Sequence, residues 1–175
     1  MKLEQQLINR VLVDNDHQAF THLINQHQVQ IRSYAVRLCG GNLALADDIA
    51  QETFITAFRK MSSYQHKGAF VGWLLKICYH HFLNYVRKNK HYALQDVPEV
   101  VYSDGVEHEM TIEKAMLSLS LAERSILTLH FTFGHTQQEI VDIMEMPLGT
   151  VKSHILRGKA KLTDIINSSE NRGAA

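Results

Sequence analysis

The sequence predicts an all-α protein made of two small helical domains joined by an acidic linker, the second containing a helix-turn-helix. Apolar residues recur at three- and four-residue spacing along most of the 175 residues, and no sustained strand-like alternation occurs. Hydrophobic residues make up 45% of the chain, enough to build a core. The length allows one ordinary domain or two small ones.

Three long helices are expected in the first domain. The first, over residues 16–39, is broken by Gly40-Gly41-Asn42, and Asn42 can cap the helix that follows. That second helix spans about 43–61 and carries its apolar residues on one face. Residues 62–68 predict a loop, and a third helix follows over about 69–90.

Charge is unevenly distributed, although the formal net charge is zero. Lys and Arg outnumber Asp and Glu in residues 1–95, which indicates a polyanionic partner for this part of the chain. Residues 96–113 contain no Lys or Arg; their acidic residues are Asp96, Glu99, Asp104, Glu107, Glu109 and Glu113. This composition predicts a linker over 93–111, between a first domain of residues 1–92 and a second of residues 112–175.

The cysteines and the N-terminal residues bear on the compartment. Cys39 and Cys78 are the only cysteines; one disulfide between them is possible, but isolated cysteines are more often buried small hydrophobes. The N-terminal stretch has no long apolar run, so we expect neither a signal peptide nor membrane insertion. A cytoplasmic location is the expectation.

Two capping boxes mark helix starts in the second domain. Ser120 pairs with Glu123, and Thr136 pairs with Glu139 at the start of a short helix through Met144. Pro147 suits the first turn of a last helix that runs to about residue 166. Two helices with so few residues between them have the spacing of a helix-turn-helix.

The last helix has the residue distribution of a recognition helix. Its apolar residues Val151, Ile155 and Leu162 can pack inward, which leaves polar residues for a DNA major groove. These polar residues are Thr150, Lys152, Ser153, His154 and Arg157. The simpler alternative is a solvated basic helix end that complements the helix dipole. The joint occurrence of capping box, Pro turn and basic helix favours DNA binding.

Two polar surfaces stand out in the first domain. The second helix presents one opposite its apolar stripe, and periodicity alone gives no reason to see more than a solvated face; its residues are Asp48, Gln51, Glu52 and Arg59. The third helix and the loop before it combine aromatic with polar and basic residues: Tyr64, Trp73, Lys76, His80, Asn84 and Arg87. Aromatic rings beside basic groups suit unstacked single-stranded bases, although core packing is equally expected for Trp73.

Two stretches resemble the sigma-70 family of bacterial transcription initiation factors. DDIAQETFITAFRK followed by GAFVGWLLKICYHHFLNYVRK is similar to region 2 of that family. MLSLSLAERSILTLHFTFGHTQQEIVDIMEMPLGTVKSHILRGKAKL is similar to region 4. Because an acidic linker joins the two regions, the chain resembles the extracytoplasmic function (ECF) group.

The resemblance implies a factor that binds core RNA polymerase and directs it to promoter DNA. It assigns polymerase binding to Asp48, Gln51, Glu52 and Arg59. It assigns −10 recognition and melting to Tyr64, Trp73, Lys76, His80, Asn84 and Arg87, and −35 binding to Thr150, Lys152, Ser153, His154 and Arg157. It also implies regulation by an anti-sigma factor, and no catalytic residue, cofactor or metal.

The chain departs from the family pattern at several positions. His80 stands where many relatives have Asn, His154 where Arg is frequent, and Glu145 where a turn Gly is common. Val141 stands where an Ala is common. A neutral imidazole makes weaker phosphate contacts than Arg, so His80 and His154 imply altered recognition of the −10 and −35 elements.

Two other classes remain as alternatives. A LuxR-type activator also carries such a helix-turn-helix, but a first domain of alternating strands and helices would be expected. A metal enzyme could use some of the eleven histidines. However, His17, His22 and His27 are five residues apart and drift around a helix, and no HExxH spacing occurs.

Overall fold

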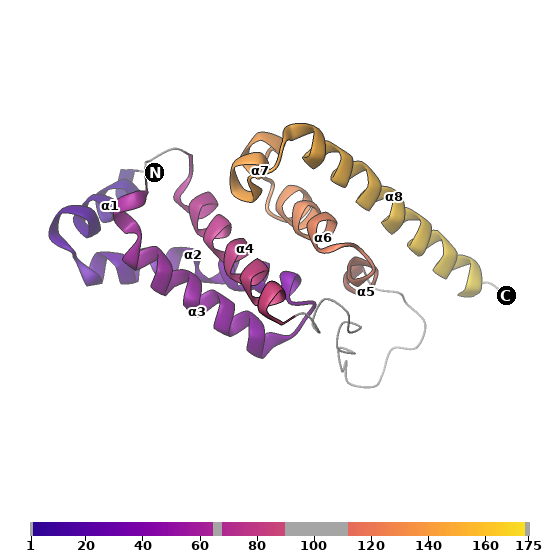
Figure 1. Ribbon diagram of the computed structural model, residues 1–175, viewed down its shortest axis with the longest axis horizontal. Helices are drawn as coiled ribbons and strands as arrows, with labels where there is room; N and C mark the ends of the chain where they lie inside the picture. The colour runs from indigo at the N-terminus through magenta and orange to yellow at the C-terminus, as the bar shows by residue number, and fades with distance from the viewer. Residues whose placement is uncertain (1, 65–67, 90–111, 174–175) are drawn as a thin grey trace. The chain divides into compact units, whose positions relative to one another are not determined.

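The computed structural model describes residues 2–64, 68–89 and 112–173. The chain divides into two compact units, unit 1 (Met1–Lys90) and unit 2 (His91–Ala175). All regular elements in the described ranges are helical (Figure 1), which confirms the all-α prediction. The predicted linker at 93–111 lies outside the described residues, and the domain limits stay predictions.

The helices of unit 1 agree with the predicted ones to within two residues, apart from one that the sequence analysis missed. They are α1 (Lys2–Asp14), α2 (His17–Leu38), α3 (Leu43–Arg59), the 3-10 turn η1 (Met61–Ser63) and α4 (Phe70–Lys88). The missed helix is α1. Its buried residues Leu7, Ile8 and Val11 cover a single short stripe among Gln and Asn, a weak periodic signal.

Side-chain caps fix where α2 and α3 begin. Asp16 Oδ1 accepts a hydrogen bond from Ala19 N at 2.9 Å, and Asn42 Oδ1 accepts one from Leu45 N at 3.1 Å. The Asn42 cap confirms the sequence-based prediction. Each cap satisfies a backbone N–H that has no partner within the helix, which stabilises the helix start by roughly 1 kcal/mol.

The core of unit 1 lies where α2, α3 and α4 pack on one another, with α1 against α2. Figure 1 shows α3 and α4 side by side. The largest fully buried side chains of unit 1 are Tyr34, Phe70, Phe82, Ile8, Leu23, Ile31, Leu38, Leu74 and Leu75. Cys39 and Cys78 are buried in this core and form no disulfide, as predicted for small hydrophobes. Burial raises the pKa of the Cys78 thiol to about 12, so this sulfur is a poor nucleophile at neutral pH.

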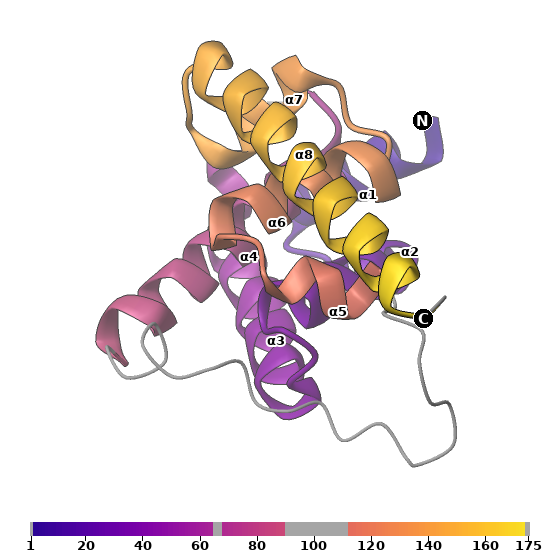
Figure 2. The same cartoon turned by 90° about the vertical axis from the view of Figure 1, so that its right-hand side faces the viewer.

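Unit 2 is organised around its last helix. Its elements are α5 (Ile112–Leu117), α6 (Leu121–Leu127), the π-turn η3 (Thr128–Thr132), α7 (Gln137–Met144) and α8 (Leu148–Gly173). Helix α8 contacts α5, α6 and α7, and Figure 2 shows it crossing in front of α6. Both predicted capping boxes are present, at Ser120 with Glu123 and at Thr136 with Glu139.

The π-turn η3 changes the direction of side chains after α6. Phe133 N donates to Thr128 O at 3.1 Å, a five-residue step that inserts an extra residue into the helical turn. Ile126 and Leu129, which precede or begin this step, are fully buried, whereas Phe131 is 61% exposed. The apolar run seen in the sequence therefore divides between core and surface.

Helix α8 differs from its predicted limits at both ends. Pro147 O accepts from Val151 N at 3.1 Å, which makes Pro147 the residue before the first helical one rather than part of the first turn. The predicted end near residue 166 is wrong, since α8 continues to Gly173. The added residues are mostly polar and carry no apolar period that a sequence could reveal.

Helix α8 lies unusually close to α6 at Gly158. A Cβ atom on Gly158 would lie 2.9 Å from Leu127 Cδ1 and 3.4 Å from Glu123 Cβ, and Leu127 is itself buried. The first distance is too short for a real carbon contact, so the absence of a side chain at position 158 sets the separation of the two helices.

Candidate polymerase and nucleic-acid interfaces

The polar surface predicted on the second long helix is one continuous face of α3. Its four residues, Asp48, Gln51, Glu52 and Arg59, are all exposed. The opposite side of α3 is buried in the core of unit 1 through Leu45, Ala46, Ile49, Ala50, Thr53 and Ala57. Ile55 is exposed among the polar residues. This face therefore combines charge with an apolar centre, a composition suited to binding a protein.

An exposed ion pair and a part-buried hydrogen bond hold α3 to its neighbours. Arg32 Nε donates to Asp47 Oδ1 at 2.6 Å, which joins α2 to α3. Thr56 Oγ1 lies 2.8 Å from His81 Nε2, which joins α3 to α4. Burial lowers the pKa of His81 and outweighs the opposing charge of Glu52, so its ring is mainly neutral at pH 7.

The candidate −10 surface on α4 is graded in exposure along the helix. Trp73, Lys76 and His80 are half-buried, and Asn84 and Arg87 are exposed. The side of α4 that carries Leu74, Leu75, Cys78, Tyr79 and Phe82 packs into the core. The structure thus brings five of the six predicted residues to the surface of one helix.

Tyr64, the sixth predicted residue, lies in the core of unit 1. It is 7% exposed, and its hydroxyl donates to Gly68 O at 3.1 Å. Its ring lies 5.2 Å from that of Phe70 in an edge-to-face arrangement and 5.4 Å from that of Trp73. Burial, and secondarily Glu4, raises the pKa of the Tyr64 phenol. In this arrangement the Tyr64 ring packs against the Trp73 ring from the side of the core. Its own exposed surface is too small for a base to stack on.

The helix-turn-helix consists of α7, a three-residue connection and α8. Ile140, Ile143 and Met144 of α7 and Val151 of α8 are buried between the helices. The turn is made by Glu145, which adopts the left-handed conformation at φ 53° and ψ 43°. Only Gly adopts this conformation without strain, so the Glu found here in place of a turn Gly carries a conformational cost.

The predicted −35 residues all lie in the first three turns of α8. Lys152, Ser153 and Arg157 are exposed, and Thr150 and His154 are half-buried. The Ser153 hydroxyl donates to Gly149 O at 2.8 Å, which leaves its lone pairs as acceptors. Leu156, which the sequence analysis passed over, is 73% exposed on the same helix. An exposed Leu between polar residues can contact the methyl group of thymine.

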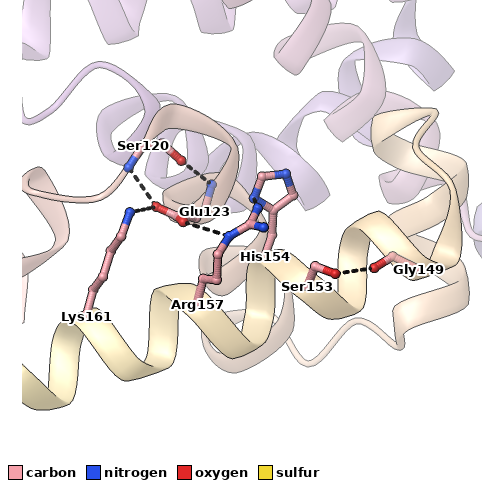
Figure 3. A network of polar contacts seen from close by, with 7 residues as sticks. All are labelled: Ser120, Glu123, Gly149, Ser153, His154, Arg157 and Lys161. Atoms are coloured by element: carbon pink, nitrogen blue, oxygen red, sulfur yellow. Dashed lines mark hydrogen bonds and ion pairs between the residues drawn. The ribbon is translucent and has the colours of Figure 1, made fainter.

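A network of polar contacts joins α8 to α6 (Figure 3). Glu123 Oε2 accepts from Lys161 Nζ at 2.8 Å and from Ser120 N at 3.1 Å. Glu123 Oε1 lies 3.6 Å from Arg157 Nε, and Arg157 Nη2 lies 3.2 Å from His154 Nδ1. The sequence analysis identified Glu123 as part of a capping box but not as a partner of the recognition helix.

The pKa values of both Glu123 and His154 are lowered in this network. Burial of the Glu123 carboxyl opposes ionisation, but the hydrogen bonds from Lys161 and Ser120 outweigh it and hold the pKa at about 2. Burial, and secondarily the positive charge of Arg157, lower the pKa of His154. A neutral His154 ring can accept the hydrogen bond from Arg157 through Nδ1.

The described residues show neither a metal site nor a membrane-spanning helix. Within them, no group of three or more His, Cys, Asp or Glu side chains is placed to hold a metal ion. No described helix combines the length and the apolar character that crossing a membrane requires. The described part of unit 1 contains helices alone, unlike the alternating first domain expected for a LuxR-type activator.

Comparisons with known proteins agree with the two-unit architecture. Residues 23–92 match the family model for Sigma-70 region 2, and residues 109–162 match that for Sigma-70, region 4. The ECF RNA polymerase sigma factor SigE of Mycolicibacterium smegmatis is 32% identical, covering 90% of this chain and 66% of the relative. The ECF RNA polymerase sigma-E factor of Escherichia coli strain K12 is 30% identical, covering 90% of this chain and 93% of the relative.

Solved structures share the fold. The sigma factor RpoE in complex with the anti-sigma factor NepR from Bartonella quintana has a TM-score of 0.69 at 21% identity, covering 85% of this chain and 96% of that one. CnrH in complex with the cytosolic domain of CnrY has the same TM-score and identity, covering 95% of this chain and 96% of that one. The two regions matched in this chain, together with its ECF relatives, show that the chain belongs to the sigma-70 family of transcription initiation factors, in the extracytoplasmic function group.

Proposed function

We propose that this sigma factor binds core RNA polymerase through the exposed face of α3, contacts the −10 element with α4 and reads the −35 element with α8. The face of α3 carries the proposal, because it is exposed and charged on a helix whose opposite side is fully buried. Residues 1–92 would act as region 2 and residues 112–175 as region 4, joined by a linker of residues 93–111.

The α3 face suits a protein partner. Asp48 and Glu52 supply negative charge, Arg59 supplies positive charge, and Ile55 supplies an apolar centre. Charged groups around an apolar residue fix the orientation of a partner and speed its association. The names of the ECF relatives include RNA polymerase, which supports the polymerase as the partner of this face.

The α4 surface suits the −10 element. Trp73 is backed by Tyr64 and Phe70, with ring centroids 5.4 and 5.6 Å away, and so presents a ring held in place. Stacking of an unpaired base on such a ring contributes about 1–3 kcal/mol, which offsets the cost of unstacking it from the duplex. Lys76 and Arg87 would neutralise nearby phosphates.

The α8 surface suits the −35 element. Lys152, Ser153 and Arg157 are exposed hydrogen-bonding groups on the second helix of a helix-turn-helix, the helix that enters the major groove in such motifs. Each DNA contact would be weak alone. Attachment to the same polymerase makes the second contact effectively intramolecular and raises the joint affinity.

The same proposal covers regulation and chemistry. An anti-sigma factor is expected to cover the polymerase-binding face, in keeping with the sigma factor RpoE solved in complex with NepR. The chain would act in the cytoplasm, where it meets polymerase and DNA, and would contribute binding energy rather than catalysis. No cofactor is needed for this function.

In vitro transcription with core RNA polymerase and a randomised promoter library tests the proposal directly. The wild-type chain should select −10 and −35 motifs. Asp48→Arg with Glu52→Arg should abolish polymerase capture in a pull-down, because two favourable charges become repulsive while both positions stay exposed. Asp14→Arg with Asp142→Arg makes the same charge change on exposed residues that do not belong to α3 and should leave capture intact. Full capture by the α3 variant would refute the assignment.

Arg157→Ala tests the assignment of α8. If Arg157 reads a base bidentately, its loss should weaken −35-dependent transcription by about 1–3 kcal/mol and relax the preference at one position. Lys159→Ala removes a neighbouring positive charge from α8 and should weaken binding evenly across sequences. Unchanged footprints and unchanged base preference in the Arg157→Ala variant would contradict the assignment.

A further inference from the structure

The carboxylate of Glu123 has a second task besides capping α6. It is 3% exposed, and it bonds to Lys161 and faces Arg157, two residues of α8 that follow it by more than thirty positions in the sequence. A buried charge is costly unless ionic and hydrogen-bonding partners surround it. The carboxylate therefore depends on the cations of α8, and those cations are drawn toward α6.

The second capping box shows that capping alone does not require this link. Thr136 and Glu139 make the same reciprocal hydrogen bonds at 3.2 and 2.8 Å. Glu139 is 51% exposed, however, and its ion pair is with His135, four residues before it in the same segment. Two chemically equal boxes thus differ in burial and in whether the carboxylate reaches the recognition helix.

Arg157 is held on two sides. Its Nε faces Glu123 at 3.6 Å and its Nη2 donates to His154 Nδ1 at 3.2 Å. Figure 3 shows the Arg157 side chain reaching across to Glu123 and lying next to the ring of His154. A guanidinium that is already oriented loses less conformational freedom when it binds a base than one that is free to move.

We propose that Glu123 is a positioning residue for promoter recognition, because its carboxylate orients Arg157 on the DNA-reading face of α8. The inference rests on the proposed −35 function of α8. The negative charge also offsets part of the positive charge of Arg157 and Lys161, which lowers attraction to phosphates of any sequence. Both effects favour the correct sequence over others.

The test uses the full chain bound to core RNA polymerase. The probes are the −35 sequence that the wild-type holoenzyme selects from a randomised library and its single-base variants. Glu123→Gln keeps an oxygen for the Ser120 backbone N–H and removes the charge. We expect discrimination to fall at least about threefold at the base pair whose preference Arg157→Ala relaxes. In the Arg157→Ala background, Glu123→Gln should cause no further loss there, because it acts through Arg157.

Two further variants separate positioning from other effects. Glu139→Gln removes the same charge from the equivalent capping box and should leave discrimination unchanged. Glu123→Asp keeps the charge but withdraws the carboxylate by one methylene, so base discrimination should fall while the slope of log K against log salt stays unchanged. If circular dichroism shows that Glu123→Gln does not fold, Glu123→Asp takes its place in the test. If the losses of base discrimination caused by Glu123→Gln and Arg157→Ala add in the double variant, the positioning role of Glu123 is wrong, while the proposed −35 function of α8 stands. Selection of no −35 motif by the wild type would overturn the proposed function with it.

Discussion

Unit 1 and unit 2 hold their functional faces in place by different means. In unit 1 the faces of α3 and α4 are the outer sides of helices whose inner sides meet in a core rich in aromatic side chains, including Tyr34, Phe70 and Phe82. In unit 2 the charged residues Glu123 and Arg124 are themselves buried, and ion pairs join the recognition helix to α6. Unit 1 also has an ion pair between helices, Arg32 with Asp47, but both of its side chains are exposed, so the buried charge of Glu123 is what distinguishes unit 2.

This difference has a general physical consequence. Apolar packing depends on volume and is insensitive to pH and salt, whereas a network of ion pairs depends on protonation and on every charge nearby. Unit 1 should therefore respond most to changes in side-chain size, and unit 2 to changes in charge, pH and backbone conformation.

Tyr64→Ala should destabilise unit 1 by roughly 3 kcal/mol, because it removes a buried ring that packs against Phe70 and Trp73. Tyr64→Phe keeps the ring and loses the hydrogen bond to Gly68, so it should cost only about 0.5–1.5 kcal/mol. Urea unfolding followed by the fluorescence of Trp73, the single tryptophan, measures both values. Unchanged stability of Tyr64→Ala with impaired promoter opening would instead place Tyr64 at the DNA.

The stability that Glu123 gives unit 2 should disappear in acid. Its pKa is about 2 in the folded chain against an ordinary value of 4.5, so the folded state binds fewer protons. The contribution is therefore fully present above about pH 4.5 and is lost as the pH falls toward about 2. Circular-dichroism melts of wild type and Glu123→Gln should differ above pH 4.5 and converge gradually as the pH falls from 4.5 toward 2. A difference that persists at pH 2 would contradict the ionised network.

Glu145→Gly should stabilise unit 2 by about 0.5–1 kcal/mol. The left-handed conformation at φ 53° strains a residue with a Cβ, and Gly adopts it freely, although a more flexible unfolded chain offsets part of the gain. Glu145→Ala keeps the Cβ and should give no such gain. The melting temperature of unit 2 distinguishes the two variants, and equal shifts in both would show that the side chain, not the backbone, decides.

His154→Arg should change DNA binding modestly and in a salt-dependent way. An added cation that reaches one phosphate steepens the dependence of log K on log salt by about 0.9. The substitution also replaces the acceptor of the Arg157 hydrogen bond by a like charge, so base discrimination should fall while affinity at low salt rises. Asn167→Arg adds the same charge farther along α8, and an equal change in slope there would show that position 154 has no special access to DNA.

The sequence predicted those parts of the fold that depend on local pattern. The three long helices of unit 1 follow from apolar spacing, and the caps at Asn42, Ser120 and Thr136 follow from residues that accept hydrogen bonds from free backbone N–H groups. The sequence did not predict α1 because its few apolar residues, spread among Gln and Asn, give too weak a helical periodicity to distinguish the segment from a loop. The predicted end of α8 was wrong because the last residues of this helix show no apolar periodicity.

The sequence predicted which candidate site residues share a helix face, but not which residues these side chains contact. Helical spacing placed Asp48, Gln51, Glu52 and Arg59 together, and all four are exposed. Spacing could not tell that Tyr64 turns into the core and donates to Gly68, because aromatic residues suit either environment. The pairing of Glu123 with Arg157 and Lys161 depends on where α8 crosses α6, which no local pattern encodes.

The close approach at Gly158 limits how this protein can be redesigned. Retargeting a sigma factor by transplanting a foreign recognition helix is a natural engineering strategy, since base contacts come from one short segment. A side chain at position 158 of a donor helix would clash with Leu127, so either Leu127 shifts or the helix moves away from α6, and such a move takes its Arg away from Glu123. A successful chimera must therefore import the groove-facing residues alone and keep the native residues that face α6.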